Sequence, residues 1–155
     1  MTGTQPRRMQ RLEGRNFTLG RIAIAFKACG EDTDGAYTLC ETVEPPGSGA
    51  GLHRHPTYDE TFIICEGRFS FRLGDETMEL GPGETVFVPR GTKHAFTCIG
   101  SEPGRQMTIS SPGGIFEAFI ADVVGAMVDS GSPSKPGPAV DFRAIAAKYG
   151  MEFID

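Results

Sequence analysis

The sequence predicts an all-β domain that ends in a short helical tail. Three observations support this prediction: short apolar runs alternate with polar residues, glycine and proline fall between those runs, and the apolar period changes after Pro112. The chain has 155 residues, among them 21 glycines and 11 prolines, and this distribution is typical of many tight turns joining short strands. A chain of this length usually forms a single domain with its own core.

The first segment, residues 1–18, is polar and rich in arginine, and we expect it to form an N-terminal arm. Its basic cluster consists of Arg7, Arg8, Arg11 and Arg15. We interpret this cluster as part of a solvated arm, because the whole chain carries a net charge of −5 and has an isoelectric point near 5.2. This acidic balance argues against nucleic acid or an acidic membrane as a partner.

The β domain is expected at residues 19–112. Strands are predicted in its alternating runs, at residues 21–29, 36–46, 68–74 and 104–112, with further strands within residues 75–100. The alternation is clearest where Phe69, Phe71 and Leu73 point to one side and the polar residues between them to the other. This pattern indicates a strand with one buried face.

The helical extension is expected at residues 113–155. Apolar residues recur there every three or four positions, which predicts an amphipathic helix carrying Phe116, Phe119, Ile120, Val123, Val124 and Met127. Residues 130–138 are rich in helix breakers and are predicted to be a linker. Asp141 is a candidate N-cap, and Gly150 a candidate C-cap, for a second short helix.

The chain has only three histidines, and their positions indicate a metal site. His53 and His55 are two residues apart and so face the same side of a strand, and Glu60 can return to that side after the bend at Pro56. His94 begins another strand, and it would join these three residues if its side of that strand points into the interior. Neutral imidazoles and a carboxylate suit a first-row divalent metal with open coordination positions.

The spacing of this group resembles the paired motifs of the cupin superfamily. Gly47 is followed by five residues, His53-x-His55, four residues, Glu60, six residues and Gly67. Later, Gly83 is followed by five residues, Pro89-x-Gly91, two residues and His94. The second motif usually ends in asparagine, where this chain has Cys98.

This resemblance implies a single jelly-roll-like cupin β-barrel with one metal ion in its mouth, held by His53, His55, Glu60 and His94. The ion would be Fe, Mn, Ni, Co, Cu or Zn. Cys98 does not stand at a ligand position, so its effect on the pocket is left open. Asp59 is expected to point outward into solvent, and we expect Tyr58 to cover the bend rather than gate a pocket.

The resemblance is to the small members that are similar to quercetin dioxygenases, which implies a metal-dependent dioxygenase acting on a small oxygen-rich aromatic or enol compound. Glu60 would act in it as both a ligand and a general base, because no other ionisable residue lies on the predicted inward face nearby. Two alternatives remain: a non-oxidative isomerase, cyclase or lyase, and a protein that binds a small molecule or metal without turnover. Five phenylalanines could line a pocket or fill the core, and we favour the core: Phe62, Phe69, Phe71, Phe87 and Phe96.

The expected partners are a small-molecule substrate and, by family resemblance, a second copy of the chain in a homodimer. The N-terminus has no apolar segment typical of a signal peptide, and no run is long enough to span a bilayer. The four cysteines contain no C-x-x-C pair, which suits reduced thiols. We therefore expect a cytoplasmic protein that contacts neither membrane nor nucleic acid.

Overall fold

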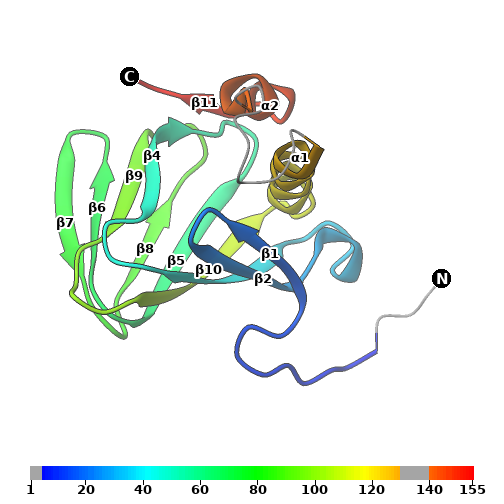
Figure 1. Ribbon diagram of the computed structural model, residues 1–155, viewed down its shortest axis with the longest axis horizontal. Coiled ribbons are helices and arrows are strands. Elements are labelled where there is room, and N and C mark those ends of the chain that lie inside the picture. Colours follow the sequence, from blue (N-terminus) through cyan, green and yellow to red (C-terminus); the bar gives the residue numbers. More distant parts are fainter. Residues whose placement is uncertain (1–4, 130–139) are drawn as a thin grey trace.

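The protein is described by a computed structural model that covers residues 5–129 and 140–155 (Figure 1). The predicted linker at residues 130–138 lies outside the described residues. Within them, no helix is both long enough and apolar enough to cross a membrane.

The structure consists of two antiparallel sheets followed by two helices. In chain order the strands are β1 (Arg15–Leu19), β2 (Ile22–Ala28), β3 (Thr38–Glu44), β4 (Gly49–Arg54), β5 (Asp59–Glu66), β6 (Phe69–Leu73), β7 (Glu76–Leu80), β8 (Thr85–Val88), β9 (His94–Cys98), β10 (Gly104–Ser111) and β11 (Glu152–Phe153). A 3-10 turn (Gly30–Asp32) lies between β2 and β3, and the helices are α1 (Ile115–Asp129) and α2 (Phe142–Lys148).

The two sheets face each other in a jelly-roll-like arrangement (Figure 1). The larger sheet has the strand order β1-β2-β3-β10-β5-β8, and the smaller has the order β11-β4-β9-β6-β7. The fold class predicted from the sequence is confirmed, although the sheets do not close into one continuous barrel.

The core between the sheets follows the predicted alternation. Phe69 and Phe71 on β6 are fully buried, whereas Leu73 at the strand end is only half-buried. Phe71 makes an edge contact with Phe62 of the opposite sheet at a ring-centroid distance of 5.1 Å. Because rings from both sheets interlock here, this cluster fixes the separation of the sheets.

The helices cover one end of the sheets, where they form a second apolar cluster (Figure 1). Phe119, Ile120 and Val123 of α1 are buried in it together with Ile24 and Phe26 of β2. The predicted amphipathic helix is therefore confirmed, except that Met127 near its end is 39% exposed.

The second helix begins as predicted. The Asp141 side chain accepts a hydrogen bond from the backbone N–H of Ala144 at 2.9 Å. The C-cap is Tyr149, one residue earlier than the predicted Gly150, which follows it with φ of 72°. The chain then enters β11, which pairs with β4 through Phe153 and His53.

The expected arm is tied to the sheets by its arginines. Arg7 forms an ion pair with Asp32, and Arg11 forms one with Glu66. Residues Arg15–Leu19 form the edge strand β1, so the expected boundary between arm and domain falls inside a strand.

Candidate metal centre

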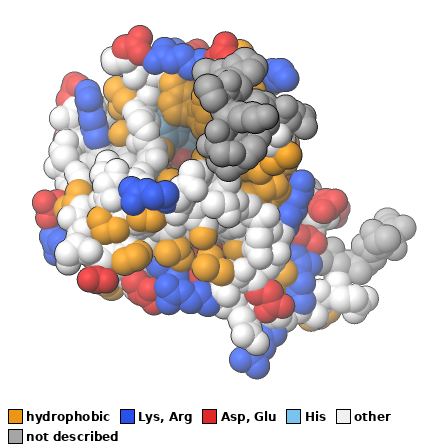
Figure 2. Space-filling model, viewed as in Figure 1, with side chains coloured by type: hydrophobic (Ala, Val, Ile, Leu, Met, Phe, Trp, Pro, Cys, Tyr) orange, Lys and Arg blue, Asp and Glu red, His pale blue; other side chains and the backbone are white. Residues whose placement is uncertain are grey.

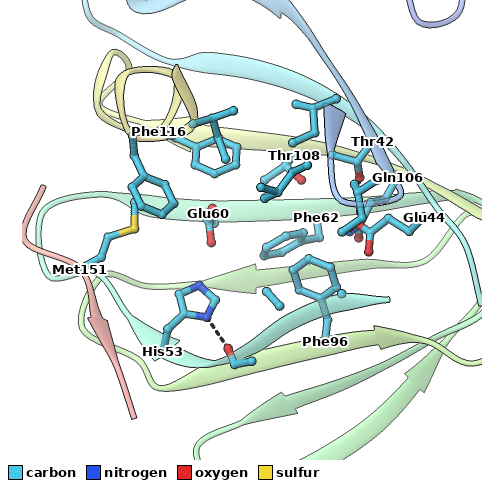
Figure 3. A pocket seen from close by; sticks show the side chains of 18 of the residues that line it. Thr42, Glu44, His53, Glu60, Phe62, Phe96, Gln106, Thr108, Phe116 and Met151 are labelled. Carbon is cyan, nitrogen blue, oxygen red and sulfur yellow. Dashed lines mark hydrogen bonds between the residues drawn. The ribbon is translucent and has the colours of Figure 1, made fainter. Parts of the chain in front are cut away.

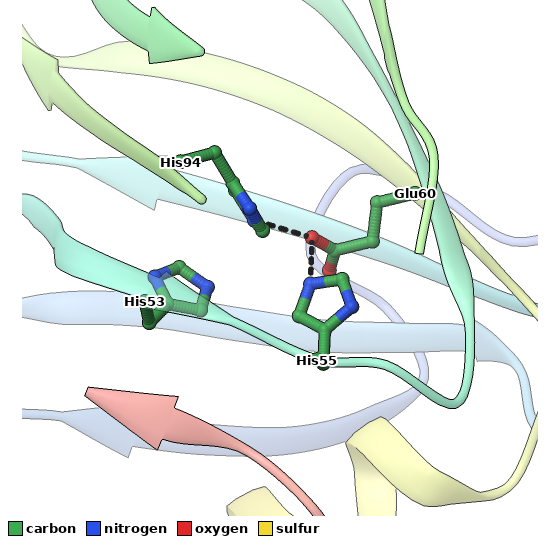
Figure 4. A group of neighbouring side chains, drawn as sticks. All are labelled: His53, His55, Glu60 and His94. Atoms are coloured by element: carbon green, nitrogen blue, oxygen red, sulfur yellow. Dashed lines mark hydrogen bonds and ion pairs between the residues drawn. The ribbon is translucent and has the colours of Figure 1, made fainter. Parts of the chain in front are cut away.

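The four predicted ligands come from three strands and one turn, and the fold brings them together (Figure 4). His53 on β4 lies opposite His94 on β9 in the register of the smaller sheet. His55 lies one residue beyond the end of β4, and Glu60 projects from β5 of the larger sheet. The group therefore bridges the two sheets at one end of the fold.

The ligand atoms of this group, one from each residue, all lie within 4.8 Å of one another. All four side chains are buried, and His53 is the most exposed of them at 8%. Glu60 Oε2 lies 2.8 Å from Nε2 of His55 and 3.1 Å from Nε2 of His94. Four donor atoms converging in a buried space are the arrangement that a small divalent cation requires.

The other ring nitrogen of each histidine contacts a backbone carbonyl oxygen. His53 Nδ1 lies 2.7 Å from the oxygen of Gly51. His55 Nδ1 lies 3.0 Å from the oxygen of Tyr58, and His94 Nδ1 lies 2.9 Å from that of Thr92. A carbonyl can only accept, so each Nδ1 carries the proton and donates it.

This assignment leaves a lone pair on each Nε2 of a neutral imidazole. At His55 and His94 that lone pair faces the carboxylate of Glu60, and two acceptors at such distances repel each other unless a positive charge lies between them. Either a proton or a metal cation meets this requirement. The donor set therefore fits a first-row divalent metal, and the carbonyl partners would orient the rings for it.

The charges of the group reinforce one another. Burial would raise the pKa of Glu60, but hydrogen bonds from His55 and His94 outweigh it and lower that pKa from 4.5 to about 2. Burial would lower the pKa of His55, yet the hydrogen bond and charge of Glu60 raise it above 6.5. Burial, with a further contribution from His94, lowers the pKa of His53 to about 4. In the metal-free protein Glu60 is thus ionised, His53 is neutral, and His55 is the more readily protonated of the two.

Two further contacts hold His55 in place. The Tyr58 ring stacks on it at a centroid distance of 3.9 Å and an interplanar angle of 3°. The backbone N–H of Gly91 donates a 3.0 Å hydrogen bond to the carbonyl oxygen of His55, and Gly91 has φ of 82°. Tyr58 is 1% exposed, so it covers the bend as expected and also supports a candidate ligand.

The residues next to the ligands lie where the sequence placed them, outside the group. Asp59 points outward and forms an ion pair with Arg90. Cys98 is fully buried in the core between the sheets, and its Sγ contacts the carbonyl oxygen of Glu102 at 3.7 Å. Cys98 is not among the residues that line the cavity next to the predicted ligands.

A cavity of about 210 Å³ extends from the ligand group into the space between the sheets (Figure 3). Its walls are mainly apolar and include Phe62 and Phe96, while Phe116 of α1 and Met151 close it on the helical side. Figure 2 shows hydrophobic side chains around a hollow in which histidine atoms are visible. Phe62 and Phe96 are therefore pocket residues, whereas Phe69 and Phe71 are core and Phe87 is 59% exposed.

The cavity also contains a carboxyl group that the sequence interpretation missed. Glu44 lines the cavity together with Gln106 and Thr42, away from the histidines (Figure 3). Glu44 is thus a second inward carboxyl group, at the end of the cavity that is remote from the predicted ligands. The alternation along β3, in which Thr38, Cys40, Thr42 and Glu44 share one face, was the available signal.

Comparisons with known proteins agree with this geometry. Residues 41–110 match the family described as "Cupin domain", and all four candidate ligands fall in this range. An uncharacterised protein of Methanocaldococcus jannaschii is 36% identical over 75 residues, which is 48% of this chain and 60% of that protein. Quercetin 2,3-dioxygenase of Bacillus subtilis is 26% identical over 117 residues, which is 76% of this chain but only 34% of that enzyme.

The fold has close structural neighbours as well. The structure of the polyketide cyclase RemF from Streptomyces resistomycificus superposes with a TM-score of 0.61 at 22% identity, covering 69% of this chain and 80% of that one. A likeness at this identity concerns the fold. Residues 41–110 thus match the cupin domain in sequence, and the motif spacing and the two facing sheets agree with that match.

Proposed function

We propose that the chain is a metal-dependent dioxygenase that acts on a small, oxygen-rich aromatic or enol compound. The observation that carries this proposal is the convergence of His53, His55, Glu60 and His94 next to a mainly apolar cavity, which His53 and Glu60 line. A bound divalent metal would supply Lewis acidity for an oxygen substituent of the substrate. Dioxygen would be the oxidant, and both of its atoms would enter the product.

The apolar walls would bind the body of the substrate and exclude water from it. Phe62 and Phe96 line the cavity and lie 5.4 Å apart between ring centroids, which suits a planar molecule against their faces. The substrate would thus be oriented with an oxygen substituent toward the histidines.

Glu60 would move the proton. Its carboxylate is ionised at neutral pH and is 4% exposed, so Oε2 can accept the proton of a substrate hydroxyl that enters the group. The similarity to a quercetin 2,3-dioxygenase supports an oxidative reaction on such a hydroxyl compound.

The test is oxygen uptake by metal-loaded protein with one- and two-ring hydroxylated aromatic compounds as the first substrates, together with single-turnover rates of Glu60→Gln at equal metal content. We expect uptake by wild type and a rate about 10²–10⁴-fold lower in Glu60→Gln. Asp59→Asn makes the same chemical change one residue away, on the outward side, and should keep the wild-type rate. Equal rates in wild type and Glu60→Gln would remove the base role.

A second candidate is non-oxidative chemistry in the same cavity. It is favoured by the 33% identity over 67 residues to the tetracenomycin polyketide synthase protein TcmJ of Streptomyces glaucescens. Turnover of an aromatic polyketide-like substrate without oxygen uptake would support this alternative and contradict the dioxygenase. Binding of ligands without any turnover would instead identify a binding protein.

A further inference from the structure

The cavity has a second polar end. Glu44 of β3 and Gln106 of β10 are each 1% exposed, and Thr42 is 8% exposed. Figure 3 shows these three side chains at one end of the cavity and His53 and Glu60 toward the other, with Phe62 and Phe96 between them. A ligand that fills the cavity therefore has a polar contact at both ends.

Only half of this polar group is satisfied by the protein. Glu44 Oε1 accepts hydrogen bonds from Thr42 Oγ1 at 3.0 Å and from Gln106 Nε2 at 2.8 Å. Glu44 Oε2 and Gln106 Oε1 are buried and form no hydrogen bond within the described part of the chain. Leaving a buried polar atom unpaired costs about 1–3 kcal/mol, so two such atoms in one polar group are unfavourable for packing alone.

The two unpaired oxygens have the chemistry to bind a hydroxyl group. Burial raises the pKa of Glu44, and its Oε2 accepts a hydrogen bond when the carboxyl is ionised and donates one when it is neutral. Gln106 Oε1 is an acceptor whose orientation is fixed, because Gln106 Nε2 already donates to Glu44. A hydroxyl group matches either form, because it can donate to one of these oxygens and can accept from a neutral carboxyl.

We propose that Glu44 and Gln106 recognise a hydroxyl group at the end of the ligand that is remote from the histidines. This inference rests on the proposed function, in which the other end of the same ligand carries the oxygen substituent near His53. The ligand is thus an aromatic compound with an oxygen substituent at one end and a hydroxyl at the other. A cavity of about 210 Å³ is below the usual range of about 300–1,000 Å³ for drug-sized ligands, which favours one or two rings.

The test uses two probes that differ only in the remote hydroxyl. Naphthalene-2,3-diol carries vicinal oxygens at one end alone, and naphthalene-2,3,6-triol adds a hydroxyl at the far end. Affinities are measured by calorimetry with zinc-loaded protein under anaerobic conditions, so that no turnover is required. We expect wild type to bind the triol about five- to tenfold more tightly, as one well-placed hydrogen bond allows.

Two variants test whether Glu44 and Gln106 cause the preference for the triol. In Gln106→Met the preference for the triol should fall below about twofold, and Glu44→Met should have the same effect. Thr108→Val is the matched control, because Thr108 lines the cavity two residues along the same strand and should leave the preference unchanged. The comparison of probes in wild type requires no variant to fold.

The outcomes separate this inference from the proposed function. If wild type binds both probes equally, the role of the pair is overturned while the ligand site at the histidines stands. A preference for the triol that survives in both Gln106→Met and Glu44→Met would also overturn it. Binding of neither probe by zinc-loaded wild type would overturn the inference and the proposed function together.

Discussion

Replacing Glu60 by glutamine in the metal-free protein should expose the charge coupling at the centre. The change removes one buried negative charge and keeps the shape of the side chain. The pKa of Glu60, lowered from 4.5 to about 2, corresponds to about 3 kcal/mol in favour of the ionised form, at about 1.4 kcal/mol per unit. Because the amide can still accept a hydrogen bond, we expect the free energy of unfolding to fall by about 2–3 kcal/mol.

The loss of stability caused by Glu60→Gln should depend on pH within a defined window. A carboxyl with a lowered pKa stabilises the fold above its unfolded value of 4.5 and loses this effect as the pH falls toward about 2. A histidine with a raised pKa stabilises the fold below 6.5 and loses this effect as the pH rises through its folded pKa. The pair of Glu60 and His55 therefore contributes most between pH 4.5 and 6.5.

The assay is thermal unfolding in chelator at pH 5.5 and pH 8.5. At about 2–4 °C per kcal/mol for a domain of this size, Glu60→Gln should lower Tm by about 4–12 °C at pH 5.5 and by less at pH 8.5. Asp59→Asn is the matched control, since its exposed ion pair contributes little. A Tm difference between wild type and Glu60→Gln that is absent, or the same at both pH values, would refute the coupling.

Three further predictions follow from the same structure. Chelation should lower Tm only modestly and leave the β-sheet circular dichroism intact, because the sheets have their own apolar core; loss of that signal at room temperature would contradict this. Metal affinity, measured by competition with a chelator, should fall as the pH drops through the raised pKa of His55, since the proton competes with the metal for Nε2. A metal affinity that stays constant down to pH 5 would count against histidine ligation. Phe71→Ala should lower the free energy of unfolding, measured in urea, by about 3–5 kcal/mol, because the ring is fully buried between the sheets. A decrease in this free energy of less than about 1 kcal/mol would show that the core is misassigned.

The convergence of the four predicted ligands could be predicted from the sequence because most of its geometry is local. His53 and His55 share a face through strand alternation, and the turn at Pro56 returns the chain to Glu60 within a few residues. The place of His94 could be predicted only from the second motif, since it is the pairing of β4 with β9 that brings His94 near His53. A cytoplasmic location and a homodimer stay predictions.

The remote end of the cavity was not predictable in the same way. Glu44 and Gln106 meet because β3 pairs with β10, and that register joins segments about sixty residues apart. Inward polar residues on an antiparallel strand look like outward ones in the sequence, since both keep the period of two. The strand β1 was missed for a related reason: its residues are polar and half-exposed, and pairing with β2 makes them a strand.

The most direct test of the metal centre is the metal content of purified protein, measured by mass spectrometry for wild type and the His53→Ala/His55→Ala double variant. Each histidine would supply one of four donor atoms, so wild type should hold about one first-row metal ion per chain and the double variant almost none. Cys98→Ala, which changes a buried residue outside the group, should keep the wild-type content. Full metal content in the double variant would contradict the assignment of the site.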